Sequence, residues 1–156
     1  MSKSELVKSH SETSVKLEPE AAIAIIGLFS SATEEEGIIS TEEYPLDEML
    51  EGIGVFEDYA EEDFDKLTAT VNSLIAQEKV ENLIPSAIAS LTKKNYRETA
   101  YIIALLVVGM EEEIPESEQE YLFELQEALK ISDERAEELI DEVFEEYEDE
   151  EEEEEE

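Results

Sequence analysis

Two uncharged apolar runs constrain the fold of this chain more than any other feature. Residues 21–29 and 101–110 contain no charged side chain, although the protein of 156 residues has 46 acidic and only 10 basic side chains. A formal net charge of -36 opposes compaction through self-repulsion. Each run is shorter than the ~20 residues that span a bilayer, so each is expected to form a buried helix.

The rest of the sequence also has helical periodicity, with apolar residues recurring every three or four positions. Few segments alternate with the period of two that a strand requires, so a sheet is not expected. Asn95 and Ser132 are suited to begin helices as N-caps. We predict an all-α, compact bundle of about seven helices. The expected helices cover about residues 19–32, 45–52, 59–77, 80–91, 95–110, 115–129 and 132–144.

The two ends of the chain differ from the helical region in composition. Residues 1–17 are polar and are predicted to form a flexible arm. Residues 18–144 form the predicted helical domain, and residues 145–156 are acidic at every position except Tyr147. Such a block repels itself, so we expect residues 145–156 to be a disordered acidic tail.

An internal repeat divides the predicted domain into two halves. In each half an apolar helix leads into an acidic turn, and the turn leads into an amphipathic helix. A shift of 75 positions aligns Glu36 with Glu111 and Glu43 with Glu118. We therefore predict two pseudo-symmetric halves, each built as helix, acidic turn and helix.

The repeated glutamates have two interpretations, and the sequence leaves both open. Glu43 and Glu118 fall where a helix begins, and a carboxylate there can accept free backbone N–H groups. Alternatively, Glu36 with Glu43, and Glu111 with Glu118, flank tight turns and could bind one hard cation such as calcium or magnesium. Neither turn has the spacing of an EF-hand loop.

The turn residues carry a resemblance to a known family. The run Glu36-Gly37-Ile38-Ile39-Ser40-Thr41-Glu42-Glu43 resembles the Asp-Gly-x-Ile-x-x-x-Glu turn of the tellurite-resistance protein B (TerB-like) family, with Glu in place of Asp. The second turn, residues 111–118, keeps the spacing but has Glu112 where the family usually has Gly. The resemblance covers about residues 19–144. It implies an all-α fold with pseudo-twofold halves and a cytoplasmic stress-response role, with divalent-metal sensing or scaffolding near the inner membrane.

Several classes of function are not expected. The absence of cysteine excludes disulfides, thiolate metal sites and thiol catalysis. The only histidine, His10, lies in the predicted arm, where it is unsuited to act as a general base. No glycine-rich phosphate loop is present. Nucleic acid is an unsuitable partner for so acidic a chain, and the one basic cluster, Lys93, Lys94 and Arg97, fits either solvated cations at a helix start or contact with an anion.

These observations predict a non-catalytic, cytoplasmic TerB-like stress-response protein with no transmembrane segment. Its candidate ligands for calcium or magnesium are Glu36, Glu43, Glu111 and Glu118. The alternative is a protein-interaction module whose helical domain and acidic tail recruit a basic partner. The protein partner is not identified by the sequence, and the resemblance implies a membrane-associated complex.

Overall fold

The computed structural model describes residues 16–31, 46–51, 53, 56–77, 80–109 and 116–143. Within these ranges the chain is helical, with short connections and no strand, so the predicted all-α fold is confirmed. The helices are α2 (Pro19–Ser31), α3 (Leu46–Leu50), α4 (Glu61–Gln77), α5 (Val80–Ser90), α6 (Lys94–Gly109) and α7 (Glu116–Ala128), followed by a helix over residues 133–143, here called the C-terminal helix.

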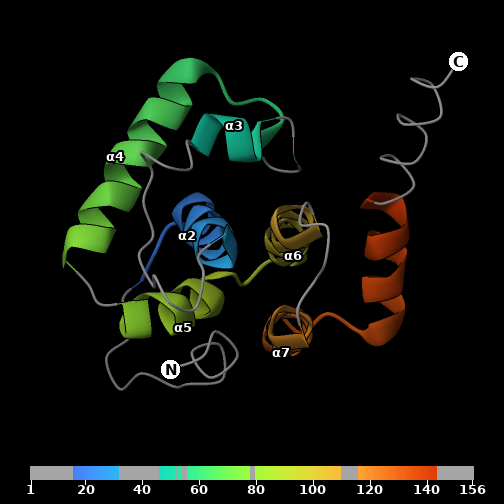
Figure 1. The fold of residues 1–156 in the computed structure, drawn as a ribbon. Coiled ribbons are helices and arrows are strands. Elements are labelled where there is room, and N and C mark those ends of the chain that lie inside the picture. Colours follow the sequence, from blue (N-terminus) through green and yellow to red (C-terminus); the bar gives the residue numbers. More distant parts are fainter. Residues whose placement is uncertain are drawn as a thin grey trace, which may run out of the picture.

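The two apolar runs form the centre of the bundle. Every residue of α2 from Ala21 to Ser30 is buried, as expected for a helix that is apolar on all sides. Its most extensive partners are α6 and α5. Figure 1 shows α2 and α6 side by side, with α3 and α4 on one side of this pair, and α5 and α7 on the other.

The C-terminal helix lies at the edge of the bundle, beside α6 and α7 (Figure 1). Its inner face carries Ala136, Leu139 and Val143, which are all buried.

The starts of α2 and α6 agree with the sequence repeat. These helices begin at Pro19 and Lys94, which are separated by the same 75 positions as the repeated glutamates. The pseudo-symmetry of the two halves stays a prediction. None of the helices in the described ranges is both long and apolar enough to cross a bilayer.

The packed region reaches slightly into the predicted N-terminal arm. Leu17 is buried, and its backbone N–H donates to Ser90 Oγ at 3.0 Å. The Ser90 hydroxyl in turn donates to the Ser86 carbonyl. This chain of two hydrogen bonds joins the start of α2 to the end of α5. The predicted acidic tail and residues 1–15 of the predicted arm lie outside the described residues.

The helix starts agree with the sequence at one predicted cap and differ at the other. Ser132 caps the C-terminal helix, because its Oγ accepts the Arg135 N–H at 3.2 Å. The prediction for Asn95 was wrong. The Arg97 N–H bonds to the Lys93 carbonyl, so α6 begins at Lys94 and Asn95 lies inside its first turn.

The end of α7 forms a Schellman motif around a residue that is not glycine. The Lys130 N–H bonds to the Glu127 carbonyl, and the Ile131 N–H bonds to the Gln126 carbonyl. This pattern requires a left-handed residue, and Lys130 has φ 60°. The Gln126 side chain reinforces the turn by donating to Ile131 O and Asp133 Oδ1. The turn therefore fixes how the C-terminal helix leaves α7.

We predict that Lys130→Gly stabilises the protein relative to Lys130→Ala by about 1 kcal/mol, because only glycine adopts the left-handed conformation without a Cβ penalty. The alanine variant is the matched control, since it removes the same charge and keeps the Cβ. Urea denaturation of both variants measures the difference. Equal stability of the two variants would contradict the strained turn.

Candidate functional site

Three of the four candidate cation ligands lie outside the described residues. Glu36 and Glu43 fall in the gap at residues 32–45, and Glu111 falls in the gap at 110–115. Glu118 is described. It lies in the first turn of α7 and is half-buried.

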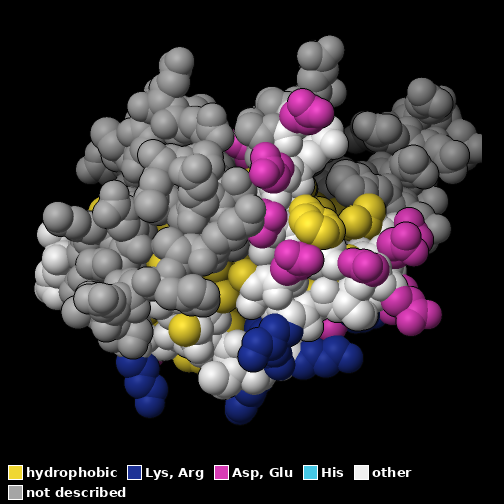
Figure 2. Space-filling view, turned by 90° about the horizontal axis from the view of Figure 1, so that it is seen from below, with side chains coloured by type: hydrophobic (Ala, Val, Ile, Leu, Met, Phe, Trp, Pro, Cys, Tyr) yellow, Lys and Arg dark blue, Asp and Glu magenta, His cyan; other side chains and the backbone are white. Residues whose placement is uncertain are grey.

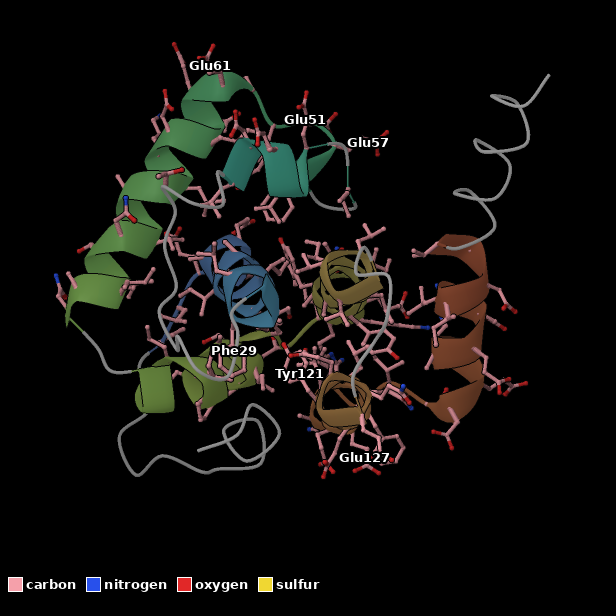
Figure 3. The ribbon with its side chains drawn as sticks, in the orientation of Figure 1. Phe29, Glu51, Glu57, Glu61, Tyr121 and Glu127 are labelled. Atoms are coloured by element: carbon pink, nitrogen blue, oxygen red, sulfur yellow. The ribbon has the colours of Figure 1, made fainter. Side chains whose placement is uncertain are left out.

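A buried pair of hydroxyl groups joins the helices next to the two gaps. Ser30, near the end of α2, and Tyr121, in the first half of α7, lie with their oxygens 2.6 Å apart. Both residues are buried, and the Phe29 and Tyr121 rings meet edge to face with centroids 5.6 Å apart. Figure 3 shows Phe29 and Tyr121 meeting between α2 and α7. We call this contact of Phe29, Ser30 and Tyr121 the α2–α7 junction.

The hydrogen-bond directions at the junction follow from the donor count. Ser30 Oγ lies 2.8 Å from the Ile26 carbonyl, which can only accept, so the Ser30 hydroxyl donates there. The Tyr121 hydroxyl therefore donates to Ser30 Oγ. Burial raises the pKa of Tyr121, the hydrogen bond to Ser30 opposes that rise, and the charge of Glu118 adds to it. The junction thus holds a neutral tyrosine close enough to Glu118 to sense its charge.

The α2–α7 junction lies close to both acidic turns in the sequence. The first turn begins at Glu34, four positions after Ser30, and the second ends at Glu118, three positions before Tyr121. The contact between Ser30 and Tyr121 therefore joins the helix before the first turn to the helix after the second.

The remaining described carboxylates do not form a metal centre. No group of three or more acidic or histidine side chains in the described ranges is arranged to hold a metal ion. Figure 3 shows Glu51, Glu57 and Glu61 around α3 and the start of α4, and Glu127 on the side of α7 away from Tyr121. Of the described carboxylates at the second turn, Glu118 is the one beside the junction.

The leucine spacing over residues 115–129 predicts a buried stripe of Leu122, Leu125 and Leu129 on α7. Leu125 and Leu129 are buried as this spacing predicts, whereas Leu122 is only half-buried and Tyr121 is fully buried. Tyr121, Leu125 and Leu129 recur every four residues, so the pattern contained this stripe as well. The leucine spacing alone therefore did not reveal that Tyr121 contacts α2.

An ion-pair network joins α6 to the C-terminal helix. Arg135 donates to both oxygens of Glu98, at 3.0 and 2.9 Å, and also to Glu138 at 2.8 Å. Lys94 lies 3.9 Å from Glu98. The hydrogen bonds from Arg135 lower the pKa of Glu98, although partial burial opposes this effect. Glu98 thus connects α6 to the C-terminal helix.

The basic cluster predicted from the sequence lies at the start of α6. Lys93 and Lys94 are exposed, and Arg97 is half-exposed. Arg97 donates from Nη2 to the Thr92 carbonyl at 3.3 Å, while its buried Nε has no hydrogen-bond partner among the described residues. The first turn of α6 contains no acidic residue. Figure 2 shows Lys and Arg side chains along one margin of the visible face and carboxylates over another part of it.

We predict that Ser30 and Tyr121 are energetically coupled. Ser30→Ala and Tyr121→Phe should each cost about 1 kcal/mol, the typical net value of a hydrogen bond. The double variant should cost clearly less than the sum, because both changes remove the same bond. Urea denaturation of the four proteins measures the coupling. Strict additivity would show that the two hydroxyls do not interact in solution.

We also predict that the stabilisation from Glu98 depends on pH. The pKa of Glu98 is lower in the folded protein than its ordinary value of 4.5, so its contribution is present above that value and is lost as the pH falls through the folded pKa. The difference in unfolding free energy between the wild type and Glu98→Gln should therefore shrink in acid.

The control for this measurement is Glu138→Gln, which leaves the two Arg135–Glu98 hydrogen bonds intact. Its difference from the wild type should be smaller at neutral pH. A Glu98→Gln difference that stays constant between pH 6 and acid would contradict a charged Glu98–Arg135 pair. General charge repulsion affects all three proteins and largely cancels in the differences.

Comparisons with known proteins do not assign this chain to a family. No family model matches the chain, and neither a curated protein nor a solved structure does. The functional argument therefore rests on the residues of this chain and on their arrangement.

Proposed function

We propose that this protein is a non-catalytic binder of divalent cations, with calcium or magnesium held by the two acidic turns. The observation that carries the proposal is the Ser30–Tyr121 hydrogen bond of 2.6 Å, which joins the helix before the first turn to the helix after the second. Glu36, Glu43, Glu111 and Glu118 are the proposed ligands. The four side chains would share one region at the α2–α7 junction.

The chemistry of these residues suits a hard cation. Calcium takes six to eight oxygen ligands, and magnesium takes six. Carboxylates and turn carbonyls supply such oxygens, whereas softer metals prefer the cysteine and histidine that the turns lack. A cation at this position would also neutralise part of the net charge of -36. Binding should therefore stabilise the fold as well as occupy a site.

The biological role that we propose follows the resemblance of the turns to the TerB-like family. It is a cytoplasmic stress-response role of the tellurite-resistance type, in which a bound cation alters contact with a membrane-associated protein complex. The support for this role is the pair of acidic turns and the all-α fold. The cation site and the stress-response role are separate claims, and the first can be tested alone.

The test is calorimetric titration of calcium, and separately of magnesium, into the full chain in about 0.15 M salt, which screens diffuse attraction to the acidic surface. We expect saturable binding that Glu118→Gln weakens by about tenfold or more, equivalent to ~1.4 kcal/mol. Glu36→Gln should have a similar effect. Glu127→Gln is the matched control, because this α7 carboxylate lies away from the junction (Figure 3).

Equal weakening by Glu118→Gln and Glu127→Gln would show that the cation is held by general charge only. Absence of saturable heat would also contradict the proposal. Both variants remove one charge and keep a side chain of the same length. Any difference in cation affinity between the two variants therefore reports the position of the lost carboxylate rather than the change in net charge.

A second candidate function is docking of a basic, amphipathic protein segment. The observation that favours it is Phe123 on α7, which is 51 % exposed. Glu116, Glu120 and Glu127 lie on the same side of α7 as Phe123, at helical spacings of seven, three and four residues, and all three are exposed. Such a surface suits a partner helix with apolar and basic side chains. In this function the acidic tail would add long-range attraction.

A further inference from the structure

The basic cluster at the start of α6 differs in charge from the rest of this acidic protein. Between Leu83 and Gly109 the charged residues are Lys93, Lys94, Arg97 and Glu98, which give a net charge of +2 over 27 positions. The rest of the chain must therefore carry -38 to give the total of -36. Lys93, Lys94 and Arg97 thus form a local positive surface, which we call the α6 basic cluster.

The nearest carboxylate does not neutralise this cluster. Both oxygens of Glu98 accept hydrogen bonds from Arg135, at 2.9 and 3.0 Å. The contact between Lys94 and Glu98 is 3.9 Å, with a lysine side chain that is 78 % exposed. Lys93 and Arg97 make no ion pair with any described carboxylate. Within the described ranges, therefore, no ion pair neutralises Lys93 or Arg97, and Lys94 stays largely exposed beside Glu98.

The other described basic side chains are spread along the chain rather than clustered. Seven of the ten Lys and Arg residues lie in the described ranges, and the other three are Lys3, Lys8 and Lys79. Arg135 is paired with Glu98 and Glu138. Lys66 lies on α4 next to Asp65, with Asp63 one turn earlier. The α6 basic cluster thus combines three cations in five positions, a density that recurs nowhere else in the described part.

The chain itself contains a segment of complementary charge. Residues 145–156 are acidic at every position except Tyr147. This segment is repelled by most of the domain surface, which carries the same sign of charge. The α6 basic cluster is the surface to which it would be attracted.

The tail is also long enough to reach the cluster. The C-terminal helix begins beside α6, because Arg135 contacts Glu98 in the second turn of that helix. Eleven helical residues, 133–143, extend ~16 Å from there. The following thirteen residues, 144–156, can span up to ~45 Å. A tail that turns back along the C-terminal helix can therefore reach Lys93 and Lys94.

We infer that the acidic segment 145–156 docks onto Lys93, Lys94 and Arg97 of its own chain. The contact is electrostatic and multivalent, and tethering gives it a high effective concentration. It competes with any external anion for the cluster, and with any cation or basic protein for the tail. Binding of a basic partner to the tail therefore releases the α6 basic cluster. This inference does not depend on cation binding at the acidic turns.

The experiment uses the absence of cysteine from the chain. A spin label on Glu154→Cys of the full chain reports its distance to backbone amides through paramagnetic relaxation. In about 0.05 M salt we expect strong broadening of the amides at residues 92–97 and little at residues 61–66, at the acidic start of α4. The broadening should disappear in about 1 M salt, where the Debye length is only ~3 Å.

Charge variants distinguish docking from chance proximity. The triple variant Lys93→Gln, Lys94→Gln and Arg97→Gln should abolish the broadening at residues 92–97. Lys66→Gln and Lys130→Gln, as matched controls, should leave it unchanged. Equal broadening at residues 92–97 and 61–66, or broadening that survives the triple variant, would overturn the inference.

A mixing experiment separates docking within one chain from docking between copies. Spin-labelled chains without nitrogen-15 are mixed with nitrogen-15-labelled chains without a spin label. We expect no broadening in the mixture. Broadening there as strong as in the doubly labelled chain would assign the contact to a second copy and overturn intramolecular docking. Circular dichroism of every variant verifies that the helical fold is retained.

Discussion

Burial of the uncharged α2 against α6 is the constraint on which the rest of the structure depends. A net charge of -36 opposes compaction at every exposed position, and only apolar burial of sufficient extent can offset it. The residues of α2 from Ala21 to Ser30 are all buried, so α2 must be enclosed by other helices. The amphipathic helices around it serve this purpose, with their carboxylates facing water and their apolar stripes facing α2 and α6.

This central packing also determines where the chemistry of the protein can lie. Once α2 is enclosed, the polar groups near its end require partners inside the protein. Ser30 donates to Ile26 and accepts from Tyr121 of α7. The hydrogen bond therefore satisfies a buried hydroxyl and, in addition, brings together the helices that flank the two acidic turns. In the proposed function, the position of the cation site would follow from this packing of α2 against α7.

Much of the helical architecture could be predicted from the sequence, because helical periodicity and turn residues are local properties. The apolar helices, the start of α2 at Pro19 and the cap at Ser132 were all predicted correctly. The start of α6 was not, because the preference of asparagine for caps gave way to a helix that begins one residue earlier. Local preferences are weak where tertiary packing decides the boundary.

The candidate site could be predicted only in part. Its acidic residues are visible as a repeat, but the contact that joins the helices flanking the two turns pairs Ser30 with Tyr121 across 91 positions. Nothing in the local pattern specifies such a long-range pairing. The Glu98–Arg135 ion pair, across 37 positions, was missed for the same reason. The pseudo-symmetry of the halves, the TerB-like relationship and the ligand set remain predictions.

The central claim is that the two acidic turns converge and can share a cation. The most direct measurement is the distance between spin labels on Gly37→Cys and Glu112→Cys, the positions that the 75-residue shift aligns, by double electron–electron resonance in the otherwise cysteine-free chain. Convergence predicts that saturating calcium shortens the mean distance and narrows its distribution, and that Glu118→Gln prevents this change. A distribution that calcium leaves unchanged would contradict the account.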